Sequence, residues 1–105
     1  MEQNIDKVYT MPYTKVQEVV WDERKNELLM SKRGLSFEPF ADMIISGEYI
    51  AMLKSPSRNK QFIFLCKFND YIHIVPCVRK NNRCLILKTV YPSRKYQKLY
   101  GGEGS

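Results

Sequence analysis

Acidic residues are scarce in the second half of this 105-residue chain, where Asp70 is the only one between Lys54 and Lys98. The same stretch holds eleven lysines and arginines, whereas residues 1–53 hold six basic and nine acidic residues. So few carboxylates exclude a carboxylate-rich magnesium site from the second half. The concentrated positive charge suits a polyanion partner, although ordinary solvated lysines give the same composition.

Several other features are missing. The sequence has no apolar run near the roughly 18 residues of a membrane span, and residues 1–4 show no signal-peptide pattern. We therefore expect a cytoplasmic protein with no membrane partner. Cys66, Cys77 and Cys84 are odd in number and lack a metal-ligand spacing, and there is no glycine-rich phosphate loop. These features predict reduced thiols, no metal and no cofactor.

Length and composition predict one globular domain over residues 1–105. A chain of 105 residues is large enough for a single modest core. With 44% hydrophobic residues, seven tyrosines, five phenylalanines and one tryptophan, it should fold rather than stay disordered. Residues 1–15 are weakly patterned, and the glycine-rich residues 101–105 are expected to form a flexible tail.

Two consecutive helices are predicted from the residues at their ends. Asp22 can cap a helix over 23–33, because its carboxylate accepts the free amide hydrogens of the first turn. Gly34 supplies the left-handed residue that ends this helix, and Ser36 is expected to cap a second helix over 37–46. The second helix repeats its apolar residues at helical spacing: Phe37, Phe40, Ala41, Ile44 and Ile45.

The remaining patterned segments are rich in β-formers and separated by turn residues. The expected strands are 16–21, 49–53, 61–68, 71–79 and 84–91, with turns at 55–59, Asn69-Asp70 and Asn81-Asn82. Pro92 then begins a short helix over 93–100. We therefore predict an α+β fold in which the two helices pack on one face of a small antiparallel sheet.

The turns assign side chains to the two faces of that sheet. With two-residue turns, Cys66 lies opposite His73 and Val75 opposite Lys88. The face expected beneath the helices is almost wholly apolar: Ile63, Leu65, Ile72, Ile74, Pro76, Val78, Leu85 and Leu87. The open face would mix aromatic and titratable groups, as single-stranded RNA requires: Phe62, Phe64, Cys66, Tyr71, His73, Val75, Arg79 and Lys88.

Any hydrolysis by this chain would have to be independent of metal. RNA permits this, because its 2′-hydroxyl is a built-in nucleophile and the protein needs only to move protons and stabilise charge. We expect Lys88, His73 and Arg79 to converge with Arg94, which begins the last helix. Arg94 would stabilise the transition state, and Lys88 would act as an acid or base.

Two segments resemble a known family. Seven residues match, in order and spacing, the start of the BrnT family of bacterial ribonuclease toxins: Trp21, Asp22, Lys25, Lys32, Gly34, Ser36 and Phe37. The run 87–95 is similar to the last strand of that family and its Ser/Arg/Lys cluster. With the β-rich runs between them, these segments cover residues 16–102.

This resemblance implies a RelE-like fold and an endoribonuclease that serves as the toxin of a type II toxin-antitoxin system. It also implies an RNA substrate and a cognate antitoxin, expected to be a small DNA-binding repressor. Arg33 stands where the family usually has His. If that His acts as an acid or base, Arg33 cannot replace it, because a guanidinium stays charged and can only stabilise phosphate charge.

Eight residues are therefore candidates for the site. The catalytic candidates are Lys88, Arg94, His73 and Arg33, and the RNA-binding candidates are Lys25, Lys32, Arg79 and Lys95. Lys25 and Lys32 are seven residues apart on one helical face, which also fits a solvated stripe. A lone strand histidine is often structural, and Arg94 and Lys95 can instead favour the helix or bind an acidic partner. Lys88 is harder to explain structurally, because it interrupts an otherwise apolar strand.

Three classes of function remain open at this point. The first is a toxin ribonuclease, which the resemblance favours. The second is an RNA-binding module on the same fold that has lost catalysis, for which the substitution at Arg33 argues. The third is an interaction protein whose basic face docks an acidic partner.

Overall fold

The computed structural model describes residues 18–54 and 61–101. The expectations for segment 1–15, the turn at 55–59 and the tail beyond Gly101 lie outside the described residues. In chain order, the elements are β1 (Glu18–Val20), α2 (Glu23–Arg33), α3 (Glu38–Ser46), β2 (Ala51–Lys54), β3 (Gln61–Phe68), β4 (Tyr71–Asn81), β5 (Cys84–Leu87), β6 (Tyr91–Pro92) and α4 (Arg94–Tyr100).

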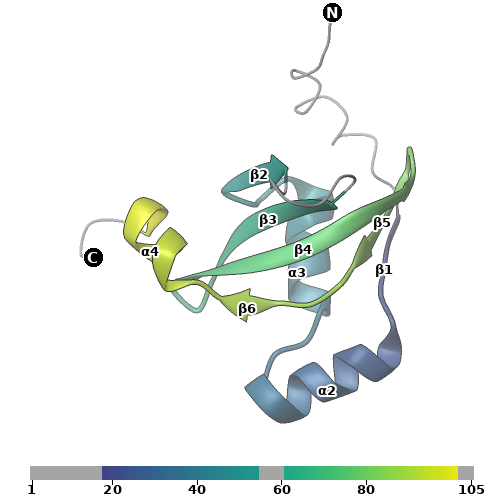
Figure 1. Cartoon of the computed structure of the whole chain (residues 1–105), viewed down its shortest axis with the longest axis horizontal. Helices are drawn as coiled ribbons and strands as arrows, with labels where there is room; N and C mark the ends of the chain where they lie inside the picture. The colour runs from purple at the N-terminus through teal and green to yellow at the C-terminus, as the bar shows by residue number, and fades with distance from the viewer. Residues whose placement is uncertain (1–17, 55–60, 102–105) are drawn as a thin grey trace, which may run out of the picture.

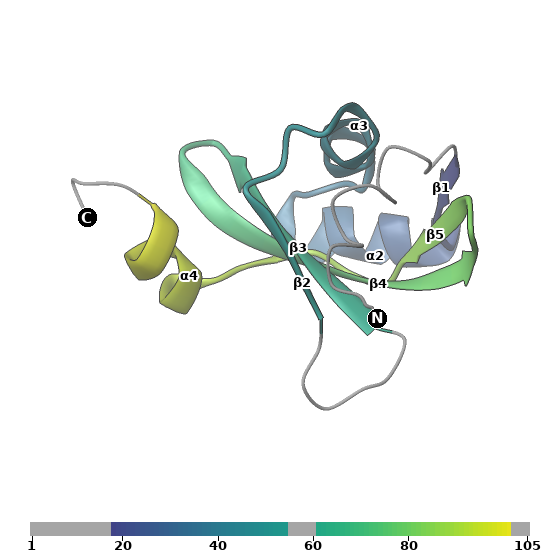
Figure 2. The same ribbon diagram turned by 90° about the horizontal axis from the view of Figure 1, so that it is seen from above.

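The described strands form one sheet in the order β1-β5-β4-β3-β2, and β6 pairs with β4 beside β5. All pairs are antiparallel except β1 with β5, which is parallel. Helices α2 and α3 lie on one side of this sheet, and α4 follows β6 at its far end (Figures 1 and 2). The predicted α+β fold, with two consecutive helices on one face of the sheet and a short C-terminal helix, is confirmed.

The ends of α2 follow from local chemistry as predicted. The Asp22 carboxylate accepts a hydrogen bond from the amide of Arg24 at 2.9 Å, and Gly34 ends the helix with φ of 69°. The predicted capping by Ser36 is wrong, because α3 begins one residue later than expected, with Phe37 at the cap position. The Phe37 amide donates instead to the Asn26 side-chain oxygen at 2.8 Å, which joins α2 to the start of α3.

The first hairpin has the predicted register. Asn69 and Asp70 have φ of 55° and 64°, which is the left-handed geometry that two-residue hairpin turns require. Phe68 therefore pairs with Tyr71, and Cys66 pairs with His73.

The predicted assignment of faces is wrong for this hairpin. Four residues of the expected open face are buried, three of them in the core beneath α2 and α3: Phe64, Cys66 and Val75, with His73 against Phe40. Leu65, Ile72 and Ile74, expected under those helices, instead pack with Tyr96 of α4 on the opposite face. Both faces are apolar here because α3 covers one and α4 the other. The more apolar pattern therefore does not identify the helix-covered side.

The register of the second hairpin is shifted by one residue from the prediction. The turn falls at Asn82 and Arg83, and the Asn81 side-chain oxygen accepts a hydrogen bond from the Arg83 amide at 2.8 Å. An irregularity between Arg79 and Asn81 absorbs the extra residue. Cys77 consequently pairs with Leu87, and both belong to the core under the helices.

The predicted strand 84–91 is interrupted. Its first part is β5 and its last residue, Tyr91, begins β6, while residues 88–90 belong to no strand. The Lys88 amide donates to the Pro76 carbonyl at 2.8 Å, but Pro76 has no N–H with which to return a bond. The ladder therefore ends here, and residues 88–90 form a short connector between β5 and β6.

Helix α4 is fixed to β4 by hydrogen bonds at Ile72. The Ile72 amide donates to the Gln97 side chain at 2.9 Å, and its carbonyl accepts from the Ser93 amide at 3.0 Å. Ser93 also caps α4 by accepting a hydrogen bond from the Tyr96 amide. Among the described helices, none is both long and apolar enough to cross a membrane.

The three cysteines are unpaired and buried. Burial raises the pKa of the Cys66 thiol from 9.0 to about 12. Burial likewise raises the pKa of Cys77 to about 12, against the opposing effect of nearby Arg79. Both thiols are therefore protonated in the folded protein at neutral pH.

We predict that the protein loses stability as the pH rises from 9 towards 12, partly through these two thiols. In this range the unfolded chain releases protons that the folded chain keeps, so the free energy of unfolding falls, by up to about 1.4 kcal/mol per pH unit for each thiol. Denaturant titrations at a series of pH values measure the slope. The variant with both Cys66→Ala and Cys77→Ala should show a shallower fall. An equal slope in both proteins would contradict the raised pKa values.

Candidate functional site

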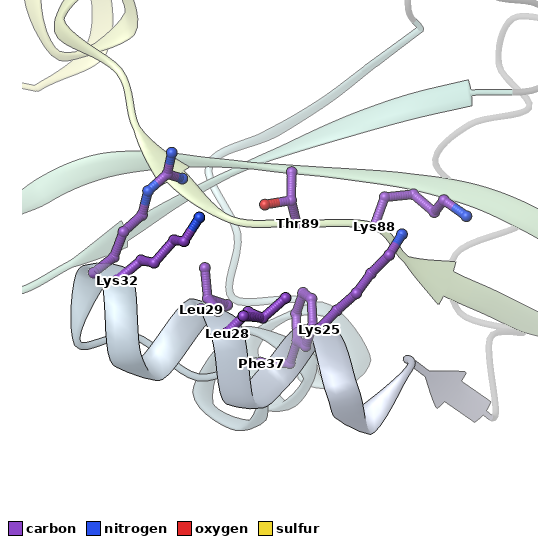
Figure 3. Close-up of a pocket in the computed structure, with 8 residues that line it drawn as sticks. Lys25, Leu28, Leu29, Lys32, Phe37, Lys88 and Thr89 are labelled. Carbon is purple, nitrogen blue, oxygen red and sulfur yellow. The ribbon is translucent and has the colours of Figure 1, made fainter.

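A cavity of about 270 Å³ lies between α2 and the connector that follows β5 (Figure 3). Its described lining comes from α2, from the start of α3 and from the connector: Lys25, Leu28, Leu29, Lys32, Arg33, Phe37, Lys88 and Thr89. The cavity exists because residues 88–90 leave the sheet opposite Pro76, while α2 stands beside them.

The contribution of α2 follows from helical periodicity. Lys25, Leu28, Leu29 and Lys32 are spaced at i, i+3, i+4 and i+7, so they share one face of the helix. Leu29 is buried, and Leu28 between the two lysines stays 53% exposed. The two lysines therefore flank an apolar strip that lies against the cavity.

Four of the lining side chains are cationic, and none of the described lining residues is acidic. Lys25, Lys32 and Arg33 are exposed on α2, while Lys88 is half-buried on the connector. Figure 3 shows Lys25 and Lys32 extending from α2 towards the connector that carries Lys88 and Thr89. Cations above an apolar floor can hold a phosphate together with the less polar part of a nucleotide.

Arg33 is bound across the end of the cavity. Its guanidinium donates a hydrogen bond from Nη1 to the carbonyl oxygen of Val90 at 2.9 Å. The centre of the guanidinium also lies 5.8 Å from the centroid of the Tyr91 ring, within the range of a cation–π contact. The side chain thus links the last turn of α2 to the connector and to β6.

The structure brings together four of the eight residues predicted from the sequence, namely Lys25, Lys32, Arg33 and Lys88. It also explains why a lysine follows the apolar run of β5. Lys88 lies where the strand ends, so its side chain meets the cavity instead of continuing the sheet.

The other four candidates lie elsewhere, so the predicted convergence of Lys88 with His73, Arg79 and Arg94 is wrong. His73 is 7% exposed, with its ring 5.6 Å from Phe40 and its Nδ1 3.0 Å from the carbonyl of Tyr71. It was expected on the open face, but α3 covers that face.

Arg79 and the two candidates of α4 do not line the cavity. The Arg79 guanidinium lies 5.2 Å from the Phe62 ring centroid. Arg94 and Lys95 are exposed on α4, where the ammonium of Lys95 lies 5.2 Å from the Tyr96 ring centroid. Because α4 packs on the opposite face of the sheet from α3, these two residues belong to a different surface.

Some lining residues were missed from the sequence. Leu28 and Leu29 could have been found, because their spacing to the two lysines places all four on one helical face. Thr89 gave no such signal, since it lay within a predicted continuous strand. In the described ranges, no cluster of three His, Cys, Asp or Glu residues is placed to hold a metal.

Comparisons with known proteins bear on the fold. No family model and no curated protein matches this sequence. Among solved structures, the chain is similar to the crystal structure of BrnT, a ribonuclease toxin of Brucella abortus. The TM-score is 0.57, with 20% sequence identity over 74% of this chain and 97% of that chain. The chain has a BrnT-like fold. At this identity, the similarity extends to the fold alone.

We predict that Lys25 and Lys32 contribute to binding of single-stranded RNA on this BrnT-like fold. Lys25→Ala and Lys32→Ala should each weaken binding. Each should also make the negative slope of log affinity against log salt concentration shallower by about 0.7, the amount expected for one lost phosphate contact. Fluorescence anisotropy at several salt concentrations measures both quantities. Lys54→Ala is the matched control, because Lys54 is exposed on β2 at the other edge of the sheet. Equal losses of affinity in all three variants would show that RNA does not bind specifically at the cavity.

Proposed function

We propose that this protein is a metal-independent endoribonuclease and the toxin of a bacterial type II toxin-antitoxin system, acting in the cytoplasm. The observation that carries the proposal is the cavity lined by four cations in a BrnT-like fold. The name of the similar structure, a ribonuclease toxin, supports the proposal at the level of the fold.

In the proposed reaction, the 2′-oxygen of RNA attacks the adjacent phosphorus while the bond to the leaving 5′-oxygen breaks. The 2′-hydroxyl must lose a proton and the leaving oxygen must gain one, and Lys88 is our candidate for one of these transfers. Lys25 and Lys32 line the same cavity and would neutralise charge on the phosphorane. RNA would leave as a 2′,3′-cyclic phosphate and a 5′-hydroxyl.

The residues outside the cavity have smaller parts in this proposal. Arg94 and Lys95 are exposed on α4 and would contact RNA away from the reacting phosphate. We assign His73 no chemical step, because substrate would have to displace α3 to reach it. Arg79 contacts Phe62 and is likewise left outside the reaction.

We predict that purified protein cleaves a mixed RNA in the presence of a metal chelator. Lys88→Ala should reduce the cleavage rate about 10²-fold, the usual scale for a lost acid or base, while Arg94→Ala should reduce it much less. Gel analysis of 5′-labelled RNA gives the rates, and thermal melting checks that both variants fold. Products with a 5′-phosphate would mean attack by water and would overturn the mechanism.

The alternative function is RNA binding without cleavage. Two observations favour it. The described lining has no histidine, and Arg33, at the position of the resembled family's His, contacts Val90 and Tyr91. Salt-dependent RNA binding with no cleavage by the wild-type protein would support this alternative. Failure to bind RNA at all would instead favour docking of an acidic protein partner.

The proposed toxin role makes a separate prediction. Induced expression in bacteria that lack a partner should arrest growth, and Lys88→Ala should relieve the arrest at equal protein level. Growth curves with immunoblotting measure both. The proposed partner is a small DNA-binding repressor, expected from a neighbouring gene, and its co-expression should restore growth. Normal growth at high levels of folded wild-type protein would contradict the toxin role.

A further inference from the structure

Helix α2 packs against the rest of the protein through few buried side chains. Leu29 is the only buried residue within it, and its hydrophobic face is interrupted by lysines. Two hydrogen bonds between side chains of α2 and backbone groups also attach the helix, each to a different segment. Asn26 accepts from the Phe37 amide near the start of α3, and Arg33 donates to the Val90 carbonyl beside the sheet.

The connector opposite α2 is also held at few points, which lie at its two ends. At one end, the Lys88 amide donates to the Pro76 carbonyl. At the other, the Val90 side chain is fully buried in the core and its carbonyl accepts the bond from Arg33. Lys88 and Thr89 line the cavity.

Arg33 therefore contacts the chain at two consecutive residues. One N–H of its guanidinium bonds the Val90 carbonyl at 2.9 Å, and its charge lies 5.8 Å from the centre of the Tyr91 ring. A planar guanidinium can donate in its plane while it stacks over a ring, which the ammonium of a lysine cannot reproduce. The pair of contacts sets the distance between the last turn of α2 and the connector.

We infer that Arg33 is a positioning residue, which holds the connector against α2 and so places Lys88 in the cavity. The inference rests on the proposed function only where it concerns cleavage. Arg33 is then neither the acid nor the base of the reaction, although it stands where the resembled family usually has His. It affects the reaction only by fixing the position of Lys88. Its cation–π contact with Tyr91 supports this role beside its hydrogen bond to Val90.

The inference is tested with Arg33→Gln, Arg33→Lys, Tyr91→Ala and Tyr91→Phe, with Arg24→Gln as the control. Arg24 is exposed on the same helix and does not line the cavity. Backbone hydrogen exchange of residues 88–90 is followed by NMR in the absence of RNA. Exchange of the Lys88 amide should quicken about tenfold in Arg33→Gln, because local opening of the connector is less opposed. Tyr91→Ala should quicken it less, and Tyr91→Phe and Arg24→Gln should match the wild type.

Steady-state cleavage of RNA gives the second readout. Arg33→Gln and Tyr91→Ala should both lower kcat, by up to about 10²-fold for the former, with little change in KM, as expected when a reacting group is misplaced. Arg33→Lys should recover part of the loss. Tyr91→Phe keeps the ring face and should retain full activity.

The outcomes separate this inference from the proposed function. If Arg33→Gln raises KM and leaves exchange at 88–90 unchanged, while Tyr91→Ala cleaves normally, Arg33 binds substrate directly and the inference is wrong. If the wild-type protein does not cleave RNA, the proposed function fails, but the exchange rates still decide whether Arg33 holds the connector. If Arg33→Gln does not fold, Tyr91→Ala and Arg33→Lys give the same decision.

Discussion

Pro76 has no backbone N–H to offer the neighbouring strand, and the cavity depends on that missing donor. Beside Pro76, the ladder between β4 and β5 stops, residues 88–90 leave the sheet, and pairing resumes only at Tyr91 in β6. A continuous strand would have kept Lys88 in the sheet. The interruption instead gives a lysine, at the end of an apolar run, a half-buried place facing α2.

The charge of the cavity is an energetic cost in the absence of a ligand. Four cations share one lining in which the described part includes no carboxylate, so they repel one another. An anion would relieve that repulsion. Local rules that are violated without compensation within the fold are typical of functional sites, and a phosphate of RNA is the compensation that we propose.

The faces of the sheet show where reasoning from sequence failed. Alternation and the Asn69-Asp70 turn correctly paired Cys66 with His73, so the side chains of β3 and β4 were sorted correctly into two sets. Which set the helices cover depends on α4, which packs Tyr96 on the opposite face. An apolar pattern indicates that a face is buried but not which helix covers it. The pattern therefore could not show that α3 covers one face of the sheet and α4 the other.

The sequence alone determined the features that depend on neighbours in the chain. Asp22 begins α2 by a local hydrogen bond and Gly34 ends it in the left-handed conformation. Helical spacing places Lys25 and Lys32 on one face of this helix. Only the tertiary structure brought Lys88 to these lysines and buried His73 beneath α3. The first outcome depends on a one-residue irregularity in β4 and on the missing N–H of a proline, and the second depends on the packing of α3 over the sheet. Their effects come from pairing and packing between distant segments, which local residue chemistry does not specify.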